Sequence, residues 1–212
     1  YIIKLALSHF RSHKFSNLDL DCRPVAIYGP NGSGKTNILE AISLFSPGKG
    51  LRRANAQNIM RRPENLGWKV SGSIEHLNKV TEIEFYSNNG STRKIKIEGK
   101  SSSQIKLSDL VQIIWLIPSM DRLWMDGAES RRKFLDRITL SIFSKHAQIY
   151  LEYEKALRER NRLLKEQVND WHWYNALEQQ MASSAISICR NRKKAIELVT
   201  ESMKDTTTQF PV

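Results

Sequence analysis

The chain has 212 residues, 33 of them Lys or Arg and 22 Asp or Glu, so its formal net charge is +11. Hydrophobic residues make up 40% and charged residues 26%, a balance that excludes a fibrous or intrinsically disordered chain. No apolar run approaches the roughly 18 residues that a membrane span needs. Cys22 and Cys189 form no CxxC pair, which argues against a disulfide framework or a zinc site and predicts a cytoplasmic protein.

The N-terminal 28 residues are expected to form strands. Residues 2–7 are mostly apolar, residues 18–21 alternate with period two, and residues 25–28 form a short apolar run that ends at Gly29, as a buried strand would. Residues 35–45 carry apolar side chains at helical spacing. Residues 46–67 then form a loop-rich insert with several Gly, Pro and basic residues.

The middle of the chain predicts an antiparallel β-meander. Its strands are expected at residues 69–75, 80–86 and 92–97, with turns at residues 78–79 and 88–90. A further apolar, β-rich segment at residues 111–117 is stopped by Pro118. We therefore expect a first domain at residues 1–128.

From Glu129 onward the apolar residues follow a helical period. A second helix carries Tyr150 and Leu164, a third, long helix begins after residue 170, and the two are predicted to form an antiparallel hairpin. Residues 129–212 are thus expected to be a helical lobe. Trp171 and Trp173, at the hairpin tip, favour packing at the helix junction over a platform for stacking bases.

Residues 29–36 match the pattern GxxxxGK[ST], which predicts a phosphate-binding loop. Glycines allow a tight turn whose N–H groups point inward, and the helix that follows directs its positive end to the same point. Lys35 is expected to reach the β- and γ-phosphates of a nucleotide, and the hydroxyl of Thr36 to ligate Mg²⁺. A chance Gly-rich turn is the alternative, and the strand–loop–helix context argues against it. The predicted cofactor-binding residues are Gly29, Pro30, Asn31, Gly32, Ser33, Gly34, Lys35 and Thr36.

The basic excess predicts a polyanionic partner, nucleic acid first, since the pI is near 9.7. The densest basic segment contains Arg52, Arg53, Arg61 and Arg62. Arg131 and Arg132 open the first predicted helix of the lobe and are further candidates for phosphate contacts. A solvated basic surface is the alternative in each case.

Several segments resemble the RecF family of ABC-type ATPases, which are related to SMC proteins. They are Phe10-Arg11-Ser12, the phosphate loop with residues 36–42, Leu116–Leu123, Arg131–Asp136, and residues 153–164. The Arg-Arg-x-Phe-Leu-Asp segment at residues 131–136 is the specific part, because many ATPases share the loop. The resemblance implies an α/β fold, namely the front part of an ABC-type P-loop ATPase head with an antiparallel β-meander and a helical lobe.

The resemblance further implies an ATP-dependent DNA-binding protein of recombinational repair and replication. Such proteins bind ATP and Mg²⁺, form a homodimer that clamps duplex DNA, and act with RecR and RecO to help load RecA at gaps. It also implies that Arg11 contacts a nucleotide phosphate and that Arg52 and Arg53 occupy an arginine loop. No apolar run ends in Asp-Asp or Asp-Glu, so the catalytic acids are expected beyond residue 212, and none within this chain. The chain is thus expected to be a fragment whose own ATPase activity is deficient.

Three alternatives remain open from the sequence. The chain could be the N-terminal ATPase part of another SMC-like repair protein, a binding module that hydrolyses nothing, or a P-loop kinase for a small substrate. Turnover stimulated by duplex DNA would distinguish the repair ATPase from the kinase.

Overall fold

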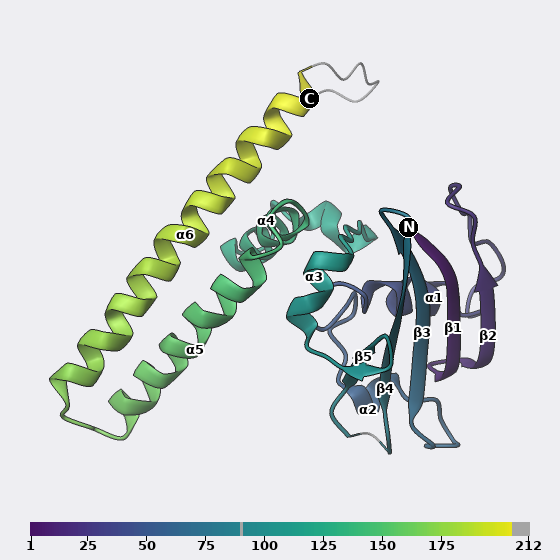
Figure 1. Cartoon of the computed structure of the whole chain (residues 1–212), viewed down its shortest axis with the longest axis horizontal. Coiled ribbons are helices and arrows are strands. Elements are labelled where there is room, and N and C mark those ends of the chain that lie inside the picture. Colours follow the sequence, from purple (N-terminus) through teal and green to yellow (C-terminus); the bar gives the residue numbers. More distant parts are fainter. Residues whose placement is uncertain (90, 205–212) are drawn as a thin grey trace. The chain divides into compact units, whose positions relative to one another are not determined.

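The computed structural model describes residues 1–89 and 91–204 and divides into two units, Tyr1–Trp115 and Leu116–Val212 (Figure 1). This division falls earlier in the chain than the boundary expected after residue 128. Residue 90 of the predicted turn at 88–90, and residues 205–212 of the predicted helical lobe, lie outside the described residues.

The first unit is built on a six-stranded sheet in the order β2-β1-β3-β4-β5-β6, with every neighbouring pair antiparallel. Its strands are β1 (Ile2–Phe10), β2 (His13–Asp19), β3 (Trp68–His76), β4 (Lys79–Ser87), β5 (Lys94–Ile97) and β6 (Lys100–Ser101). The predicted meander is thus confirmed as β3, β4 and β5, and β2 begins earlier than the predicted strand at 18–21.

Helix α1 (Lys35–Ser43) and the turn after it are covered by one face of this sheet. Strands β3 and β4 alternate buried and exposed residues, so their apolar side chains lie on that face. Phe45 lies directly against Gly72, where a Cβ atom would come within 2.4 Å of the Phe45 ring, and its ring meets Phe85 edge-on with centroids 4.9 Å apart. The absence of a side chain at Gly72 therefore lets the end of α1 approach the sheet.

Short elements complete the first unit and the link that follows it. Helix α2 (Ala56–Ile59) lies within the predicted loop-rich insert. The 3₁₀ turn η1 (Gln104–Lys106) leads directly into α3 (Leu107–Leu110), and η2 (Pro118–Arg122) follows in the second unit.

Two predicted strands are wrong. Residues 25–28 are not a buried strand: they join no sheet, and Val25 and Tyr28 are 59% and 93% exposed. Residues 111–117 also pair with no described strand, although burial alternates along them and Val111 is extended. A buried parallel strand needs hydrogen-bonded neighbours. The six described strands pair with one another and, through the bridge from Phe10 to Met60, with one residue outside the strands, but with no part of these two segments.

The second unit consists of α4 (Ala128–Ile142), α5 (His146–Lys165) and α6 (Trp171–Met203). Helices α5 and α6 form the predicted antiparallel hairpin (Figure 1). Asp170 caps α6 by accepting a hydrogen bond from the Trp173 N–H at 3.1 Å. None of the described helices is both long enough and apolar enough to cross a membrane.

The prediction that Trp171 and Trp173 pack at the helix junction is wrong. Their side chains are 71% and 42% exposed, whereas Ala156, Leu163 and Leu177 form the buried contact between the two helices. Both tryptophans lie in the first turn of α6, beyond the reach of that contact.

Candidate functional site: the phosphate loop and an arginine-lined hollow

The phosphate loop, residues 29–36, has the backbone conformation that its glycines allow. Gly32 and Gly34 have φ values of +84° and +94°, and α1 begins immediately afterwards at Lys35. The backbone N–H groups of Lys35 and Thr36 meet no acceptor in the described part of the chain, because the first helical hydrogen bonds come from Asn37 and Ile38 to the Gly34 carbonyl. Free N–H groups at a helix N-terminus attract an anion.

Lys35 folds back over the loop. Its Nζ donates to the carbonyl oxygens of Gly29 at 2.7 Å and Pro30 at 2.8 Å. An ammonium group has three donors, so these two bonds orient the side chain along the loop and leave a third donor for a phosphate oxygen.

The loop is held from β2 by His13. His13 Nε2 lies 3.1 Å from the Gly34 carbonyl oxygen, and His13 Nδ1 lies 2.9 Å from Ser16 Oγ. A Cβ atom on Gly34 would come within 2.6 Å of His13 Nε2 and 2.7 Å of Ser12 Oγ. Position 34 therefore requires glycine for a steric reason as well as for its left-handed backbone.

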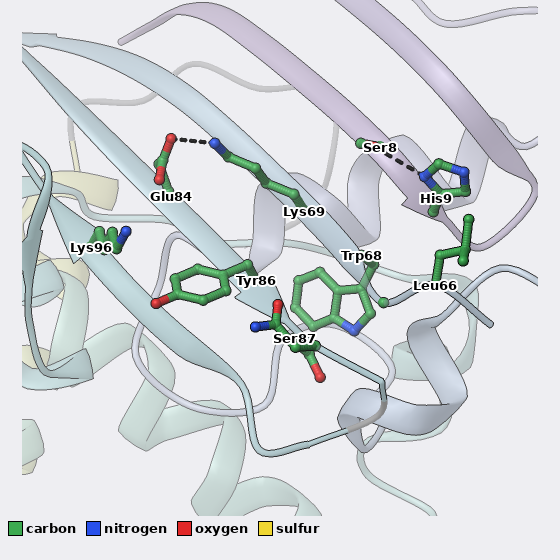
Figure 2. A pocket seen from close by; sticks show the side chains of 11 residues that line it. Ser8, His9, Leu66, Trp68, Lys69, Glu84, Tyr86, Ser87 and Lys96 are labelled. Carbon is green, nitrogen blue, oxygen red and sulfur yellow. Dashed lines mark hydrogen bonds and ion pairs between the residues drawn. The ribbon is translucent and has the colours of Figure 1, made fainter.

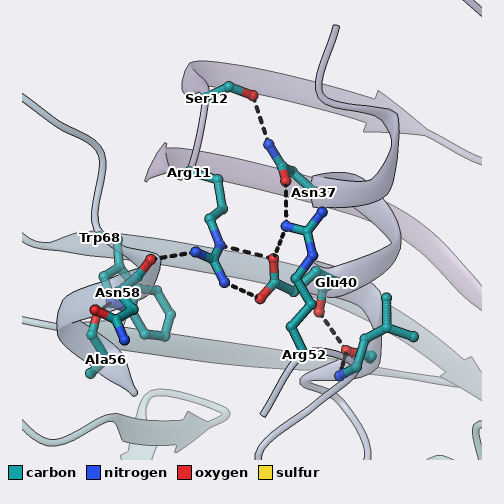
Figure 3. Close-up of polar contacts among 10 residues, drawn as sticks. Arg11, Ser12, Asn37, Glu40, Arg52, Ala56, Asn58 and Trp68 are labelled. Carbon is teal, nitrogen blue, oxygen red and sulfur yellow. Dashed lines mark hydrogen bonds and ion pairs between the residues drawn. The ribbon is translucent and has the colours of Figure 1, made fainter. Parts of the chain in front are cut away.

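Beside the loop, two arginines share one buried carboxylate (Figure 3). Arg11 donates from Nε and Nη2 to the two oxygens of Glu40 at 2.9 and 2.6 Å, and Arg52 Nη1 donates to Glu40 Oε2 at 2.9 Å. The Glu40 side chain is 2% exposed, against 21% for Arg11 and 42% for Arg52. The acid is therefore buried behind the two guanidinium groups, which remain accessible to a ligand.

These arginines line a hollow of about 760 Å³, which we call the arginine hollow. Its lining residues are Arg11, Ser12, Asn37, Arg52, Arg53, Ala54, Asn55, Asn58, Met60 and Arg62. Asn37 Nδ2 donates to Ser12 Oγ at 2.7 Å, so the hollow adjoins the phosphate loop through the first turn of α1. The side chains of Arg53 and Arg62 make no ion pair with a described residue, which leaves the hollow strongly positive.

Arg61 lies next to the hollow but has a different role. Its backbone N–H donates to the His9 carbonyl at 2.9 Å, its Nη1 donates to the Ser12 carbonyl, and its Nε lies 3.3 Å from Glu64. Arg61 thus fastens the segment after α2 to the end of β1, and its guanidinium is already engaged.

Arg131 and Arg132 belong to the other unit. Arg131 Nη1 donates to the Asp126 carbonyl at 2.8 Å, and Arg132 is exposed. The structure therefore brings Arg11, Arg52, Arg53 and Arg62 together, with Arg61 beside them.

In the helical unit, Asp136 connects α4, α5 and α6. It accepts two hydrogen bonds from Arg192, at 2.6 and 2.8 Å, and His146 Nε2 lies 3.3 Å away. Burial tends to raise the pKa of Asp136, but the hydrogen bonds from His146 and Arg192 outweigh it and hold that pKa below its usual range. The last residue of the Arg-Arg-x-Phe-Leu-Asp segment therefore stabilises the helix junction.

A second, smaller hollow lies on the other face of the sheet (Figure 2). Its cations are engaged within the hollow itself: Lys69 pairs with Glu84 at 2.5 Å, and Lys96 Nζ lies 5.3 Å from the centre of the Tyr86 ring. It offers an anion less free positive charge than the arginine hollow does.

At the loop, the hydroxyl of Thr36 is exposed and can supply a ligand to Mg²⁺. No group of three or more His, Cys, Asp or Glu side chains that could hold a metal occurs among residues 1–89 and 91–204. One hydroxyl suits Mg²⁺ where phosphate oxygens and water supply the other ligands.

Two residues of the site escaped sequence reasoning, Glu40 and His13. The only signal for Glu40 is a single acid within the apolar spacing of residues 38–45. His13 had no signal, because its contact with the phosphate loop spans 21 residues.

Comparison with known proteins gives consistent results. The model of the AAA domain family matches residues 4–209. The DNA replication and repair protein RecF of Rhizobium rhizogenes is 37% identical over 217 residues, which cover 100% of this chain and 58% of the relative. RecF of Brucella suis is 40% identical, over 93% of this chain and 52% of the relative. The chain thus spans a little over half the length of these curated relatives.

Solved structures show the same likeness. A structure of the recombination mediator protein RecF with ATP has a TM-score of 0.82 and 26% identity, and the match covers 96% of this chain and 56% of that one. An SMC ATPase structure matches 65% of this chain and 99% of its own with a TM-score of 0.51 at 21% identity, which bears on the fold alone. The fold is that of the front part of an ABC-type ATPase head, as the sequence predicted.

Proposed function

Because the chain belongs to the AAA domain family and resembles RecF along its whole length, we propose that it is the nucleotide-binding part of an ATP-dependent DNA-binding protein of replication and recombinational repair. The observation that carries this proposal is the phosphate loop at the start of α1, with Lys35 laid across the Gly29 and Pro30 carbonyls.

In this proposal ATP binds at residues 29–36. The free N–H groups of Lys35 and Thr36 and the ammonium of Lys35 would neutralise phosphate charge, which is the main contribution a protein makes to phosphoryl transfer. The Thr36 hydroxyl would supply one ligand to Mg²⁺, and the metal would neutralise charge on the β- and γ-phosphates. Arg11 would contact a phosphate from the edge of the arginine hollow.

DNA would bind by its phosphates rather than its bases. Arg53 and Arg62 line the open arginine hollow with guanidinium groups that pair with no described acid, and arginine binds phosphate oxygens in a bidentate manner. Because Arg61 is engaged with Ser12 and Glu64, we assign it to holding the hollow in shape. Arg131 and Arg132 remain proposed phosphate contacts on the helical unit.

The complete protein, in this proposal, forms a homodimer around ATP that clamps duplex DNA and helps load RecA at gaps, with RecR and RecO as partners. ATP binding would favour the dimer and hydrolysis would release it. The relatives support this proposal because they are named as DNA replication and repair proteins. We also propose that the protein acts in the cytoplasm.

The test compares Lys35→Ala with the control Lys49→Ala, which removes an exposed lysine of the loop after α1. Lys35 contributes charge but little buried volume, so K35A should abolish ATP binding and leave the thermal melt unchanged. Fluorescent ATP titration and circular dichroism measure the two quantities on the same sample.

Unchanged ATP affinity in K35A would refute the nucleotide site. If the complete protein turned over ATP only with a small phosphate acceptor, and duplex DNA had no effect, the chain would be part of a P-loop kinase instead.

A further inference from the structure

Glu40 is a buried acid that the sequence argument did not use. It lies on α1, only 2% of its side chain is exposed, and each of its carboxylate oxygens accepts a hydrogen bond from Arg11. A buried carboxylate is costly unless it is paired and hydrogen-bonded. Here one carboxylate pairs with two guanidinium cations, so Glu40, Arg11 and Arg52 together carry a net positive charge.

The same contacts fix the orientation of both arginines. Arg11 has φ of +55°, and its third nitrogen, Nη1, donates to the Asn58 carbonyl at 2.5 Å. Arg52 Nη1 donates to both Glu40 and Asn37 Oδ1, each at 2.9 Å. A guanidinium has five N–H donors, so two remain on Arg11 and three on Arg52 for a ligand.

Helix α1 also connects Glu40 to the phosphate loop. The helix begins with the loop residue Lys35, carries Asn37 in its first turn, and carries Glu40 in its second turn, buried behind the two arginines that line the hollow. The two anion-binding features therefore share one rigid element.

We propose that Glu40 is a positioning residue that presets Arg11 and Arg52 as a paired clamp for the phosphate chain of a nucleotide bound at residues 29–36. This inference rests on the proposed nucleotide site and adds a selectivity: the clamp favours a triphosphate over a diphosphate, because the extra phosphate brings the additional negative charge. Glu40 itself touches no phosphate. It holds two guanidinium groups at a common position, which lowers the entropy lost when they meet the ligand.

The main variant is Glu40→Gln, with Glu82→Gln as its matched control. Glu82 is an exposed residue of β4, and its replacement makes the same change in net charge. E40Q keeps the size of the side chain but presents an amide NH₂ to one guanidinium, so the two-oxygen contact with Arg11 is lost. We expect the ratio of the dissociation constants for ADP and ATP to fall about tenfold in E40Q, the value of one charge-assisted contact. The same ratio should not change in E82Q.

A purely structural role would give a different result. In that case E40Q would lower the melting temperature and weaken ADP and ATP binding equally. An unchanged ratio of the two dissociation constants would overturn the inference. A wild-type chain that bound neither nucleotide would overturn the proposed nucleotide site, and the inference with it. The two failures are therefore distinguishable.

Arg52→Gln keeps the test decisive if E40Q does not fold. Arg52 is 42% exposed, and its removal leaves Glu40 paired with Arg11, so the variant should be stable. We expect R52Q to lower the ratio of the dissociation constants for ADP and ATP as E40Q does. The double variant should lower that ratio no further, because both substitutions disrupt the same clamp. Full additivity of the two effects, or an unchanged ratio in R52Q, would contradict the clamp.

Discussion

Replacement of Gly34 by alanine tests the geometry of the phosphate loop directly. The new Cβ atom would lie 2.6 Å from His13 Nε2 and 2.7 Å from Ser12 Oγ. The imidazole has little freedom to move away, because it contacts the Gly34 carbonyl on one side and Ser16 Oγ on the other. The substitution should therefore strain the connection between β2 and the start of α1.

Gly32 provides a matched control for the size of this effect. Its φ of +84° is close to the +94° of Gly34, but nothing lies within 4 Å of a Cβ atom built there. The left-handed backbone costs an alanine about 1–2 kcal/mol at either position. Overlap with neighbouring atoms adds about 1–3 kcal/mol at Gly34 alone. We expect G34A to lower the free energy of unfolding by about 3 kcal/mol and G32A by about 1 kcal/mol.

Urea unfolding of the wild type, G32A and G34A without nucleotide measures the difference. His13→Ala in the G34A background should recover part of the loss, since it removes the atom nearest to the new Cβ. If G34A were as stable as G32A, His13 and Ser12 would not lie against Gly34, and the described packing of the loop would be refuted.

Two further predictions concern DNA binding and pH. Arg53→Glu with Arg62→Glu, two arginines of the arginine hollow, should weaken binding of duplex DNA by the complete protein and reduce the slope of log K against log salt by about two, at roughly 0.9 per phosphate contact; an unchanged slope would place the contacts elsewhere. Asp136→Asn should lower the free energy of unfolding of the helical unit by about 2 kcal/mol at neutral pH. Because folding lowers the pKa of Asp136, its stabilisation is present above the unfolded value of about 4 and is lost as pH falls through the folded value. Acid titration of wild-type stability should show that loss, and D136N should not.

Local periodicity was sufficient to predict most of the elements. The alternation in residues 69–97 specified the meander, and the apolar spacing after Glu129 specified three helices, because one side of each element is buried. The same reasoning failed for residues 25–28 and 111–117. Their composition suits a strand, but a strand also needs partners, and partners are a property of the whole sheet rather than of the segment.

For the candidate site, too, the sequence predicted one part and missed another. The loop at residues 29–36 can be recognised in the sequence because its residues are contiguous. The role of each residue follows from its own chemistry and its position in that short pattern. Glu40 pairs with residues 29 positions earlier and 12 positions later. No periodic signal marks such a contact, so a buried acid in a helix looks like any polar residue until the fold brings the arginines to it.

The last prediction is that this chain alone binds ATP but hydrolyses it poorly. Hydrolysis needs a group that orients the attacking water and ligands that hold Mg²⁺, and the described residues offer Thr36 at the loop without a cluster of acids. Two apolar segments, residues 25–28 and 111–117, also contain residues that are more than half exposed, namely Val25, Tyr28, Ile114 and Leu116. We expect these segments to associate with further strands. We expect turnover with Mg²⁺ and duplex DNA far below that of a full-length relative such as Rhizobium rhizogenes RecF, and light scattering should detect self-association. A monodisperse chain that hydrolysed ATP at the full-length rate would show that a catalytic carboxylate lies within these residues.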